Sequence, residues 1–470
     1  VGRDARHGSE TFAKDAVDVA ASARVRVHRF ARPVPTPITA FAVRHLRTAA
    51  GVMVTASHNP AHDNGYKVYA SDGAQIIPPD DARIADLSAR LGAPPVEPLS
   101  AEDSARIETI DERELLEAYA RVAIALLAPT PERNLSCVYT PLHGVGGAVV
   151  PDLFVQAGFA PLVVVPEQFA PDPDFPTVSF PNPEEPGALD LAIAEATRLD
   201  VDLVIANDPD ADRLAIAVRE ARGKYRVLTG NELGSILGDH LIAASSGQDR
   251  LVATTIVSSR MLSAIARDAG VAFAETLTGF KWIARAQRTV PGHRLLFGYE
   301  EALGYAVSDA VADKDGITAA LVVAGLAAHE KAHGRTLLDR LADLEHRFGV
   351  HATAQISLRR EGTEGTAEIE QMMVNLRAAP PTEIGDRKIT EIVDYLPGFG
   401  QLPRSDVLAF FTDDDARVVV RPSGTEPKLK AYVEVKSAPI GPGDLSSARR
   451  RACTELEELR EAVEALLSKR

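Results

Sequence analysis

The chain contains 470 residues, of which 45% are hydrophobic and 25% are charged, and its formal net charge is −15. This composition is typical of a globular protein with several buried cores, so it excludes a disordered chain and a membrane protein, and the acidic balance argues against a nucleic-acid surface. An anionic ligand would need local basic or amide-rich loops.

The two cysteines and the first residues of the chain each support one expectation. Cys137 and Cys453 lie far apart and follow no metal-ligand spacing, which favours two reduced thiols in a cytoplasmic protein. Val1-Gly2-Arg3-Asp4 is typical of the end of a strand entering a loop. We therefore expect that an N-terminal segment is absent from this sequence.

Short apolar runs alternate with helical patterns along the first three quarters of the chain, which favours α/β domains with largely parallel sheets. Helices are predicted over 112–127 and 188–197, and the apolar stretch 316–328 is predicted to be a buried helix, too short to span a bilayer. The predicted strands are 52–54, 138–139, 162–165, 203–205, 252–256 and 295–297.

The last quarter changes character. Strands at 407–412, 417–421 and 429–435 are joined by short turns, which predicts an antiparallel sheet. The tail 444–469 is predicted to be a helix, and its apolar stripe either forms a dimerising coiled coil or, as we favour, packs on its own sheet. The stripe consists of Ala452, Leu456, Leu459, Val463 and Leu466. Linkers are predicted at 77–103 and 361–386.

Ser57 follows the first predicted strand and precedes His58. A serine hydroxyl needs a neighbouring base or charge to act as a nucleophile, and His58 is adjacent. A turn at 63–65 leads to a returning strand at 66–69, which brings Lys67 back towards Ser57. Lys67 would be a proton shuttle if its pKa fell well below about 10.4. The alternative is a turn that only caps a helix.

Asp208, Asp210 and Asp212 alternate after strand 203–205, so extended backbone places their carboxylates on one side. Each like-charge contact at about 4 Å costs about 4 kcal/mol at an effective dielectric of about 20, and a hard cation such as Mg²⁺ relieves this repulsion. Arg213 would stabilise a transferring phosphoryl group. A solvated acidic turn is the alternative. A phosphatase of the Asp-x-Asp type fits poorly, because Asp212 replaces its Thr or Val.

A third polar loop follows strand 295–297. Glu300 and Glu301 are either a general acid and base, as in glycosidases, or acceptors for vicinal sugar hydroxyls. Adjacent side chains on extended backbone diverge, which disfavours the first interpretation. Upstream, 278–281 offers a flexible amide and the cation Lys281.

A fourth loop, 421–428, lies between two predicted strands. Its arginine, two hydroxyls and glycine amide suit a phosphate, although an ordinary turn is the alternative. These groups come from Arg421, Ser423, Gly424 and Thr425.

Together, the four loops resemble those of the α-D-phosphohexomutase superfamily, the phosphoglucomutase/phosphomannomutase group. The resemblance covers nearly the whole chain, with four motifs in family order near family spacing. It implies three similar mixed-sheet α/β domains and a C-terminal α+β domain with an antiparallel sheet, in a four-domain heart-shaped architecture. The expected boundaries are 1–127, 128–228, 229–348 and 349–470.

The resemblance also implies an activity. The chain would be an isomerase, an intramolecular phosphotransferase that interconverts sugar 1-phosphate and 6-phosphate through phospho-Ser57 and a bisphosphate intermediate. It would need Mg²⁺ and a sugar bisphosphate activator, and would act in the cytoplasm as a monomer or homodimer. The implied catalytic residues are Ser57, His58, Lys67 and Arg213; the implied metal ligands are Ser57, Asp208, Asp210 and Asp212; the implied substrate contacts are Arg6, Thr278, Gly279, Lys281, Glu300, Glu301, Arg421, Ser423, Gly424 and Thr425.

Two departures from the family pattern leave alternatives open. Hexose enzymes have Gly-Glu-x-Ser in the sugar loop, whereas this chain has Ala302 in place of the serine. The missing hydroxyl makes a pentose-phosphate mutase the second hypothesis. The family segment upstream of Arg6 is also not present. A non-catalytic sugar-phosphate-binding protein is the third hypothesis, and the retained Ser57 and Lys67 argue against it.

Overall fold

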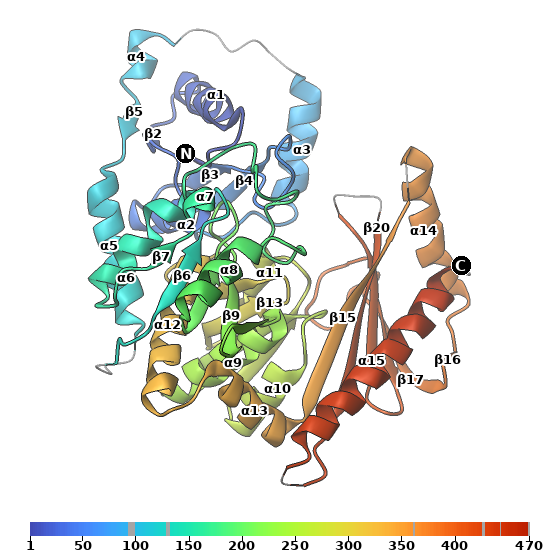
Figure 1. Ribbon diagram of the computed structural model, residues 1–470. Helices are drawn as coiled ribbons and strands as arrows, with labels where there is room; N and C mark the ends of the chain where they lie inside the picture. The colour runs from blue at the N-terminus through green and yellow to red at the C-terminus, as the bar shows by residue number, and fades with distance from the viewer. Residues whose placement is uncertain (93–98, 128–131, 361, 425–427, 442, 469–470) are drawn as a thin grey trace. The chain divides into compact units, whose positions relative to one another are not determined.

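The computed structural model describes residues 1–92, 99–127, 132–360, 362–424, 428–441 and 443–468 (Figure 1). These residues form two compact units. The first comprises Val1–Ala253 and Gly279–Leu338, and the second comprises Thr254–Thr278 and Asp339–Arg470. Among the described helices, none combines the length and the apolarity needed to cross a bilayer.

The first unit begins with a three-stranded sheet of order β1-β3-β4. β1 is parallel to β3, and β3 and β4 form an antiparallel hairpin in which Met53 pairs with Lys67. This hairpin returns the chain beside the loop that carries Ser57. The elements of this region are β1 (Gly2–Arg3), α1 (Ser9–Ser22), β2 (Val27–Arg29), α2 (Thr36–His45), β3 (Ala50–Val54), β4 (Tyr66–Ala70), α3 (Asp80–Leu91), α4 (Ala101–Ser104), β5 (Ile107–Thr109) and α5 (Glu112–Ala125).

The second sheet has the order β10-β9-β8-β6-β7. Its strands β7, β6 and β8 are parallel, whereas β9 and β10 are antiparallel additions. The loop between β8 and β9 carries the three aspartates, at the carboxyl end of a buried parallel strand. The elements are β6 (Cys137–Thr140), η1 (Val145–Ala148), α6 (Val150–Gln156), β7 (Val163–Val164), α7 (Pro166–Phe169), α8 (Asp190–Leu199), β8 (Leu203–Ala206), β9 (Ala215–Ala221) and β10 (Lys224–Val227).

The rest of the first unit surrounds the antiparallel pair β13 and β14. Glu300 ends β13 and Glu301 begins the tight turn to β14, while α12 is buried along most of its length. Asp315 begins α12 by accepting hydrogen bonds from the amides of Ile317 and Thr318, both at 3.0 Å. The elements are α9 (Gly230–Ala244), β11 (Arg250–Thr255), α11 (Phe280–Ile283), η2 (Ala286–Arg288), β13 (Arg294–Glu300), β14 (Gly304–Ala306) and α12 (Gly316–Ala332).

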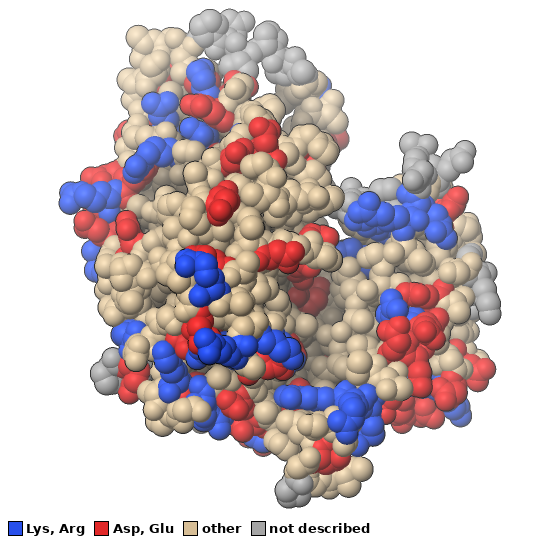
Figure 2. Space-filling model, in the orientation of Figure 1, with Lys and Arg blue, Asp and Glu red and all other residues tan. Residues whose placement is uncertain are grey.

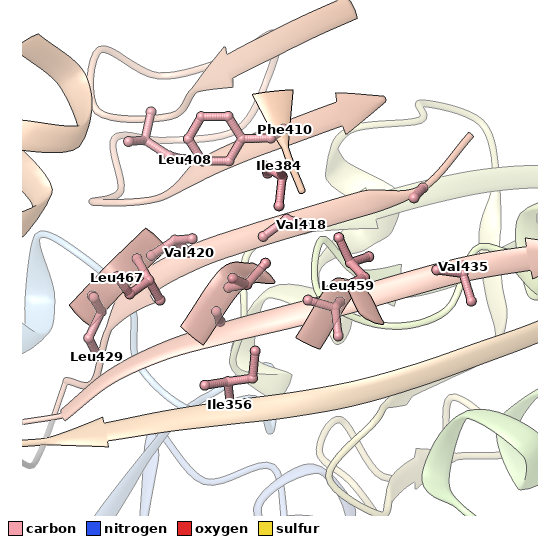
Figure 3. Packing of buried hydrophobic residues seen from close by; sticks show 14 of the residues in the cluster. Ile356, Ile384, Leu408, Phe410, Val418, Val420, Leu429, Val435, Leu459 and Leu467 are labelled. Carbon is pink, nitrogen blue, oxygen red and sulfur yellow. The ribbon is translucent and has the colours of Figure 1, made fainter. Parts of the chain in front are cut away.

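The second unit is built on a six-stranded sheet of order β15-β20-β19-β18-β17-β16, antiparallel throughout. The long helix α15 packs on it, with Leu459 and Leu467 in one buried cluster with Val420 and Val435 (Figure 3). The elements are α10 (Met261–Asp268), β12 (Ala272–Thr276), α13 (Leu337–Phe348), β15 (Val350–Arg359), α14 (Gly362–Ala378), β16 (Glu383–Ile384), β17 (Arg387–Asp394), β18 (Leu408–Thr412), β19 (Arg417–Pro422), β20 (Lys428–Ser437) and α15 (Leu445–Ser468).

The structure confirms the predicted fold class, each predicted strand and the packing of the C-terminal helix on its own sheet. Both predicted linkers are wrong in part. Residues 77–103 contain α3, and residues 361–386 contain α14 and β16. Prolines flank α3 on both sides, but its acidic start and regular apolar spacing are those of a helix.

Candidate active site

Ser57 lies in a tight loop just beyond β3, with a left-handed φ of 50°. Its amide donates to the side-chain oxygen of Thr55 at 2.9 Å, which stabilises this unfavourable backbone conformation. The Ser57 hydroxyl donates to Asp208 Oδ2 at 2.8 Å and lies 3.2 Å from His58 Nδ1. The loop thus places the hydroxyl between a carboxyl group and an imidazole nitrogen.

Arg6 organises this loop through its backbone. Its guanidinium donates to the carbonyls of Ser57 at 2.6 Å, Asn59 at 2.5 Å and Pro60 at 2.6 Å. Its side chain is buried beside Asp4. Because these donors point at the loop backbone, the geometry favours a loop-shaping role for Arg6 rather than the direct substrate contact expected from sequence.

Asp208, Asp210 and Asp212 form a fully buried cluster after β8. Each offers an oxygen atom, and these atoms lie within 4.8 Å of one another. The Oδ1 atoms of Asp210 and Asp212 are buried without a hydrogen-bond partner among the described residues. Burial and the neighbouring aspartates raise the pKa of Asp208 well above its ordinary value. Closely spaced, unsatisfied hard oxygen atoms fit a divalent cation, so the cluster can hold a metal ion.

Cationic side chains face the three carboxylates. Lys67 Nζ lies 2.7 Å from both Asp210 Oδ2 and Asp212 Oδ2, and Lys314 Nζ lies 2.8 Å from Asp212 Oδ2. Arg213 donates its amide to Asp208 Oδ1 at 2.9 Å and keeps its side chain near Glu184, at 3.5 Å. These positive charges reduce the repulsion among the aspartates.

The pKa values of His58 and Lys67 are shifted in opposite directions. Burial, assisted by the Arg213 cation, lowers the pKa of His58 well below its ordinary value, so its ring is neutral at pH 7. Burial also disfavours a charged Lys67, but Asp210 and Asp212 outweigh it and raise the pKa of Lys67 well above its ordinary value. The lowered pKa that would make Lys67 a proton shuttle does not occur in this arrangement.

The loop with Glu300 lies next to the aspartate loop, because Arg213 and Gly304 form an isolated β-bridge. Glu300 Oε1 accepts a hydrogen bond from the Gly279 amide at 2.8 Å, and Gly279 has a φ of 110° that favours glycine. Burial raises the pKa of Glu300 to about 7. The carboxyl group therefore changes charge near neutral pH.

The remaining predicted contacts in this region are less enclosed. Glu301 is half-buried, and Lys281 Nζ lies 3.6 Å from Asp81 Oδ2 in a partly exposed pair. Thr278 is half-buried and belongs to the second unit.

The predicted phosphate loop lies at the end of β19 in the second unit. Arg421 is half-buried and pairs with Lys430 across the sheet, and the Ser423 amide donates to the Lys428 carbonyl at 2.7 Å. Gly424 is exposed, and Thr425 lies outside the described residues. Figure 2 shows Lys and Arg interspersed with Asp and Glu over the visible face, so attraction of an anion depends on local groups such as these.

Comparison with known proteins covers nearly the whole chain. Residues 1–93, 115–223 and 229–348 match domains I, II and III of the phosphoglucomutase/phosphomannomutase family, described as alpha/beta/alpha domains, and residues 359–440 match its C-terminal domain. The chain belongs to the phosphoglucomutase/phosphomannomutase family. The family expected from the four loops is thereby confirmed, while the individual residue roles and the four domain boundaries stay predictions.

Relatives with curated names support the assignment. A probable phosphomannomutase of Haemophilus influenzae is 42% identical over 93% of this chain and 87% of its own. A phosphoglucomutase of Staphylococcus epidermidis is 37% identical over 92% of this chain and 82% of its own.

Solved structures agree in fold. A putative phosphomannomutase from Thermus thermophilus has a TM-score of 0.72 at 22% identity, covering 98% of this chain and 89% of its own. The Paramecium phosphoglucomutase parafusin, in its open form, has a TM-score of 0.71 at 19% identity, covering 98% of this chain and 87% of its own.

The sequence of this phosphoglucomutase/phosphomannomutase family member did not predict Lys314 as a site residue. The structure brings Lys314 to Asp212 from a segment far along the chain. The sequence pattern that could have indicated this residue is Asp313-Lys314-Asp315-Gly316, a charged run directly before an apolar helix. Such a run is usually a solvated cap, so its pattern alone does not place it in the site.

Proposed function

We propose that the chain is a phosphosugar mutase that interconverts sugar 1-phosphate and sugar 6-phosphate through phospho-Ser57 and a bisphosphate intermediate. One observation carries the proposal: the Ser57 hydroxyl lies 2.8 Å from a carboxylate of the Asp208, Asp210 and Asp212 cluster. A hydroxyl in that place would hold its phosphoryl group beside a bound cation.

We expect the cation to be Mg²⁺, held by the three aspartates and by the ester on Ser57. When bound, it would act as a Lewis acid that neutralises charge on the phosphoryl oxygens. The oxygen donor set suits Mg²⁺, which prefers carboxylates and phosphates. A sugar bisphosphate activator, a cytoplasmic location and a monomer or homodimer remain predictions.

In the forward half-reaction, a sugar hydroxyl attacks the phosphorus of phospho-Ser57, and the bond from phosphorus to Ser57 Oγ breaks. The sugar hydroxyl loses its proton and Ser57 Oγ takes one up, so the step balances. Neutral His58, 3.2 Å from Ser57 Oγ, is placed to accept the Ser57 proton when that oxygen attacks in the return step, and as imidazolium to give it back when the oxygen leaves. Lys67, as a fixed cation, stabilises charge instead of moving the proton. Arg213 and Lys314 add positive charge around the transferring group.

Other residues would hold the substrate. Glu300 and Glu301 would accept hydrogen bonds from sugar hydroxyls, while Gly279, Thr278 and Lys281 would line the sugar loop. The phosphate that is not reacting would be bound by the fourth loop, through Arg421, Ser423, Gly424 and Thr425. Because either phosphate must be bound there in turn, the intermediate has to reorient before its second phosphate returns to Ser57.

The preferred sugar is a hexose, glucose or mannose, in keeping with the family. The relatives are named for both activities. A pentose is the second candidate, because Ala302 lacks the hydroxyl that hexose enzymes place after the glutamate. Glucose 1-phosphate, mannose 1-phosphate and ribose 1-phosphate should be assayed side by side with Mg²⁺ and the matching bisphosphate. Release of inorganic phosphate without any isomer would overturn the mutase proposal.

Ser57→Ala is expected to lower isomerisation by roughly 10⁴-fold or more, because it removes the phosphate carrier. The control is Ser88→Ala, which changes an exposed serine of α3. Peptide mass spectrometry of the wild-type protein should find partial phosphorylation on Ser57. Near-normal turnover by Ser57→Ala, or phosphate found only elsewhere, would contradict the assignment of the donor.

A further inference from the structure

Lys314 is flanked in the chain by two buried carboxylates with different partners. Asp313 and Asp315 are 1% and 2% exposed. Asp315 begins α12 and accepts a hydrogen bond from the Tyr119 hydroxyl at 2.8 Å. Asp313 Oδ1 accepts from the Lys314 amide at 2.9 Å. Asp313 thus binds the Lys314 amide itself, whereas Asp315 binds amides in the first turn of α12.

Asp313 is in turn held by the β3–β4 hairpin region. Its Oδ2 accepts hydrogen bonds from the Tyr69 hydroxyl at 3.0 Å and from Gln75 Nε2 at 2.8 Å. Arg285 braces this region by donating to the Gln75 carbonyl at 2.6 Å. Burial and the adjacent Asp313 raise the pKa of Tyr69 well above its ordinary value, so the phenol keeps the proton that it donates.

Tyr69 and Lys67 are two residues apart on β4, so their side chains lie on the same face of the strand. Lys67 reaches Asp210 and Asp212, while Tyr69 reaches Asp313. The same strand thus places the Lys67 ammonium directly on the aspartate cluster. It also orients a second ammonium group, that of Lys314, through Asp313. A lysine side chain has high rotational freedom, so a fixed backbone is needed to keep its ammonium on one carboxylate.

We propose that Tyr69 and Asp313 are positioning residues that hold Lys314 Nζ on Asp212 and thereby set both the cation affinity of the aspartate cluster and the rate of phosphoryl transfer. The second effect rests on the mutase function proposed above; the first does not. Neither residue touches the reacting atoms. They act by fixing the place of a positive charge that competes with the metal and accompanies the transferring group.

The chain offers a matched pair of variants. Tyr69→Phe and Tyr119→Phe each remove one fully buried hydroxyl that donates to a buried carboxylate. Of these two carboxylates, Asp313 is the one that accepts the Lys314 amide. Lys314→Met is the reference for complete loss of the charge. Both tyrosine variants are expected to lose similar stability, so thermal unfolding separates folding damage from the specific effect.

The first readout is Mn²⁺ binding to the full chain, measured by electron paramagnetic resonance. Each protein is first treated with a phosphatase, and mass spectrometry checks that Ser57 then carries no phosphate. Tyr69→Phe is expected to bind Mn²⁺ roughly threefold to tenfold more tightly than wild type, because a competing cation is loosened. Lys314→Met should shift affinity further in the same direction, and Tyr119→Phe should not shift it. Equal Mn²⁺ affinity in the two tyrosine variants would overturn the proposal.

The second readout is the split between kcat and KM for the best sugar phosphate. Tyr69→Phe is expected to lower kcat by roughly tenfold with little change in KM, since Lys314 acts on the reacting phosphoryl group. Tyr119→Phe should retain wild-type values. If the wild-type protein isomerises no sugar phosphate but the ranking of Mn²⁺ affinities holds, the proposed function fails while the positioning role stands. If the wild-type protein isomerises a sugar phosphate but the Mn²⁺ affinities do not follow that ranking, the positioning role fails while the proposed function stands.

Discussion

Glu300 shows how a single carboxyl group acquires a functional property from burial. Its Oε1 accepts from the Gly279 amide, and burial raises its pKa from the ordinary 4.5 to about 7. As an ionised acceptor it would bind sugar hydroxyls well, and as a protonated group it would bind them poorly. Sugar recognition should therefore depend on pH close to neutrality.

We expect kcat/KM of the wild-type protein to fall below pH 7 with an apparent pKa near 7, the value for Glu300. Glu300→Gln should lose this acid limb and be about tenfold less active at pH 8, because a hydrogen bond to a charged acceptor contributes about 1.5–3 kcal/mol. Steady-state kinetics on both sides of neutral pH checks both expectations. An unchanged acid limb in the variant would assign the titration to another group.

Stability gives an independent check on the same residue. A carboxyl group whose folded pKa exceeds its unfolded value stabilises the fold below the unfolded value and loses this contribution as pH rises through about 7. The melting temperature of Glu300→Gln, relative to wild type, should therefore increase as the pH rises from about 5 to about 8. A constant difference would show that the Glu300 pKa is not raised.

At the scale of elements, the aspartate loop is shaped by close packing against the loop after β6. A Cβ atom added at Gly144 would lie 2.3 Å from both Cα and O of Pro209. The two loops are also joined by a backbone hydrogen bond, since the Val145 amide donates to the Pro209 carbonyl at 2.8 Å. Glycine is needed here because the two backbones approach too closely for any side chain.

Gly144→Ala is expected to displace the aspartate loop and weaken Mn²⁺ binding by roughly tenfold or more, since ligand placement within a fraction of an ångström sets metal affinity. Titration calorimetry on the full chain measures the change. Gly441→Ala is the control, because a Cβ there meets open space. Unaltered metal affinity in Gly144→Ala would show that the loop relaxes without moving its carboxylates.

The C-terminal helix shows what an element-level pattern can and cannot predict. The spacing of Ala452, Leu459 and Val463 correctly predicts the face of α15 that packs on the sheet. Leu466 belongs to the predicted stripe, yet it is only partly buried, while Leu467 is 1% exposed. A step of one residue rotates a helix position by about 100°, so the edge of an apolar face is decided by the surface it meets.

At the scale of the whole molecule, the division into two units does not follow chain order, because residues 254–278 belong with the C-terminal sheet. A buried ionic network in the second unit joins these two stretches of chain. Glu434 lies 3.1 Å from Arg417, 2.9 Å from Arg260 and 2.9 Å from His351. Burial disfavours its charge, but Arg417 and the other partners outweigh burial and lower the pKa of Glu434.

Glu434→Gln should destabilise the second unit by about 3–5 kcal/mol at pH 7, because it leaves buried arginines without their counter-charge. Hydrogen exchange of the β20 amides reports this local stability. A lowered folded pKa stabilises the fold above the unfolded value of about 4.5, and this contribution is lost as the pH falls below that value towards the folded pKa, so the deficit should stay constant from pH 7 to about pH 5 and shrink only at more acidic pH. Glu461→Gln, on the exposed face of α15, should change stability by less than about 0.5 kcal/mol.

The sequence by itself determined the family, the class of fold and the positions of Ser57, the three aspartates and Glu300, because each sits in a short loop whose residue types already express its chemistry. Only the tertiary structure decided that Arg6 faces the loop backbone, that Lys67 contacts Asp210 and Asp212, and that Lys314 contacts Asp212. Those properties depend on burial and on contacts between residues such as Tyr69 and Asp313, which are 244 positions apart. Local sequence carries no record of such distances, and the electrostatic state of a buried group is set by its neighbours in space.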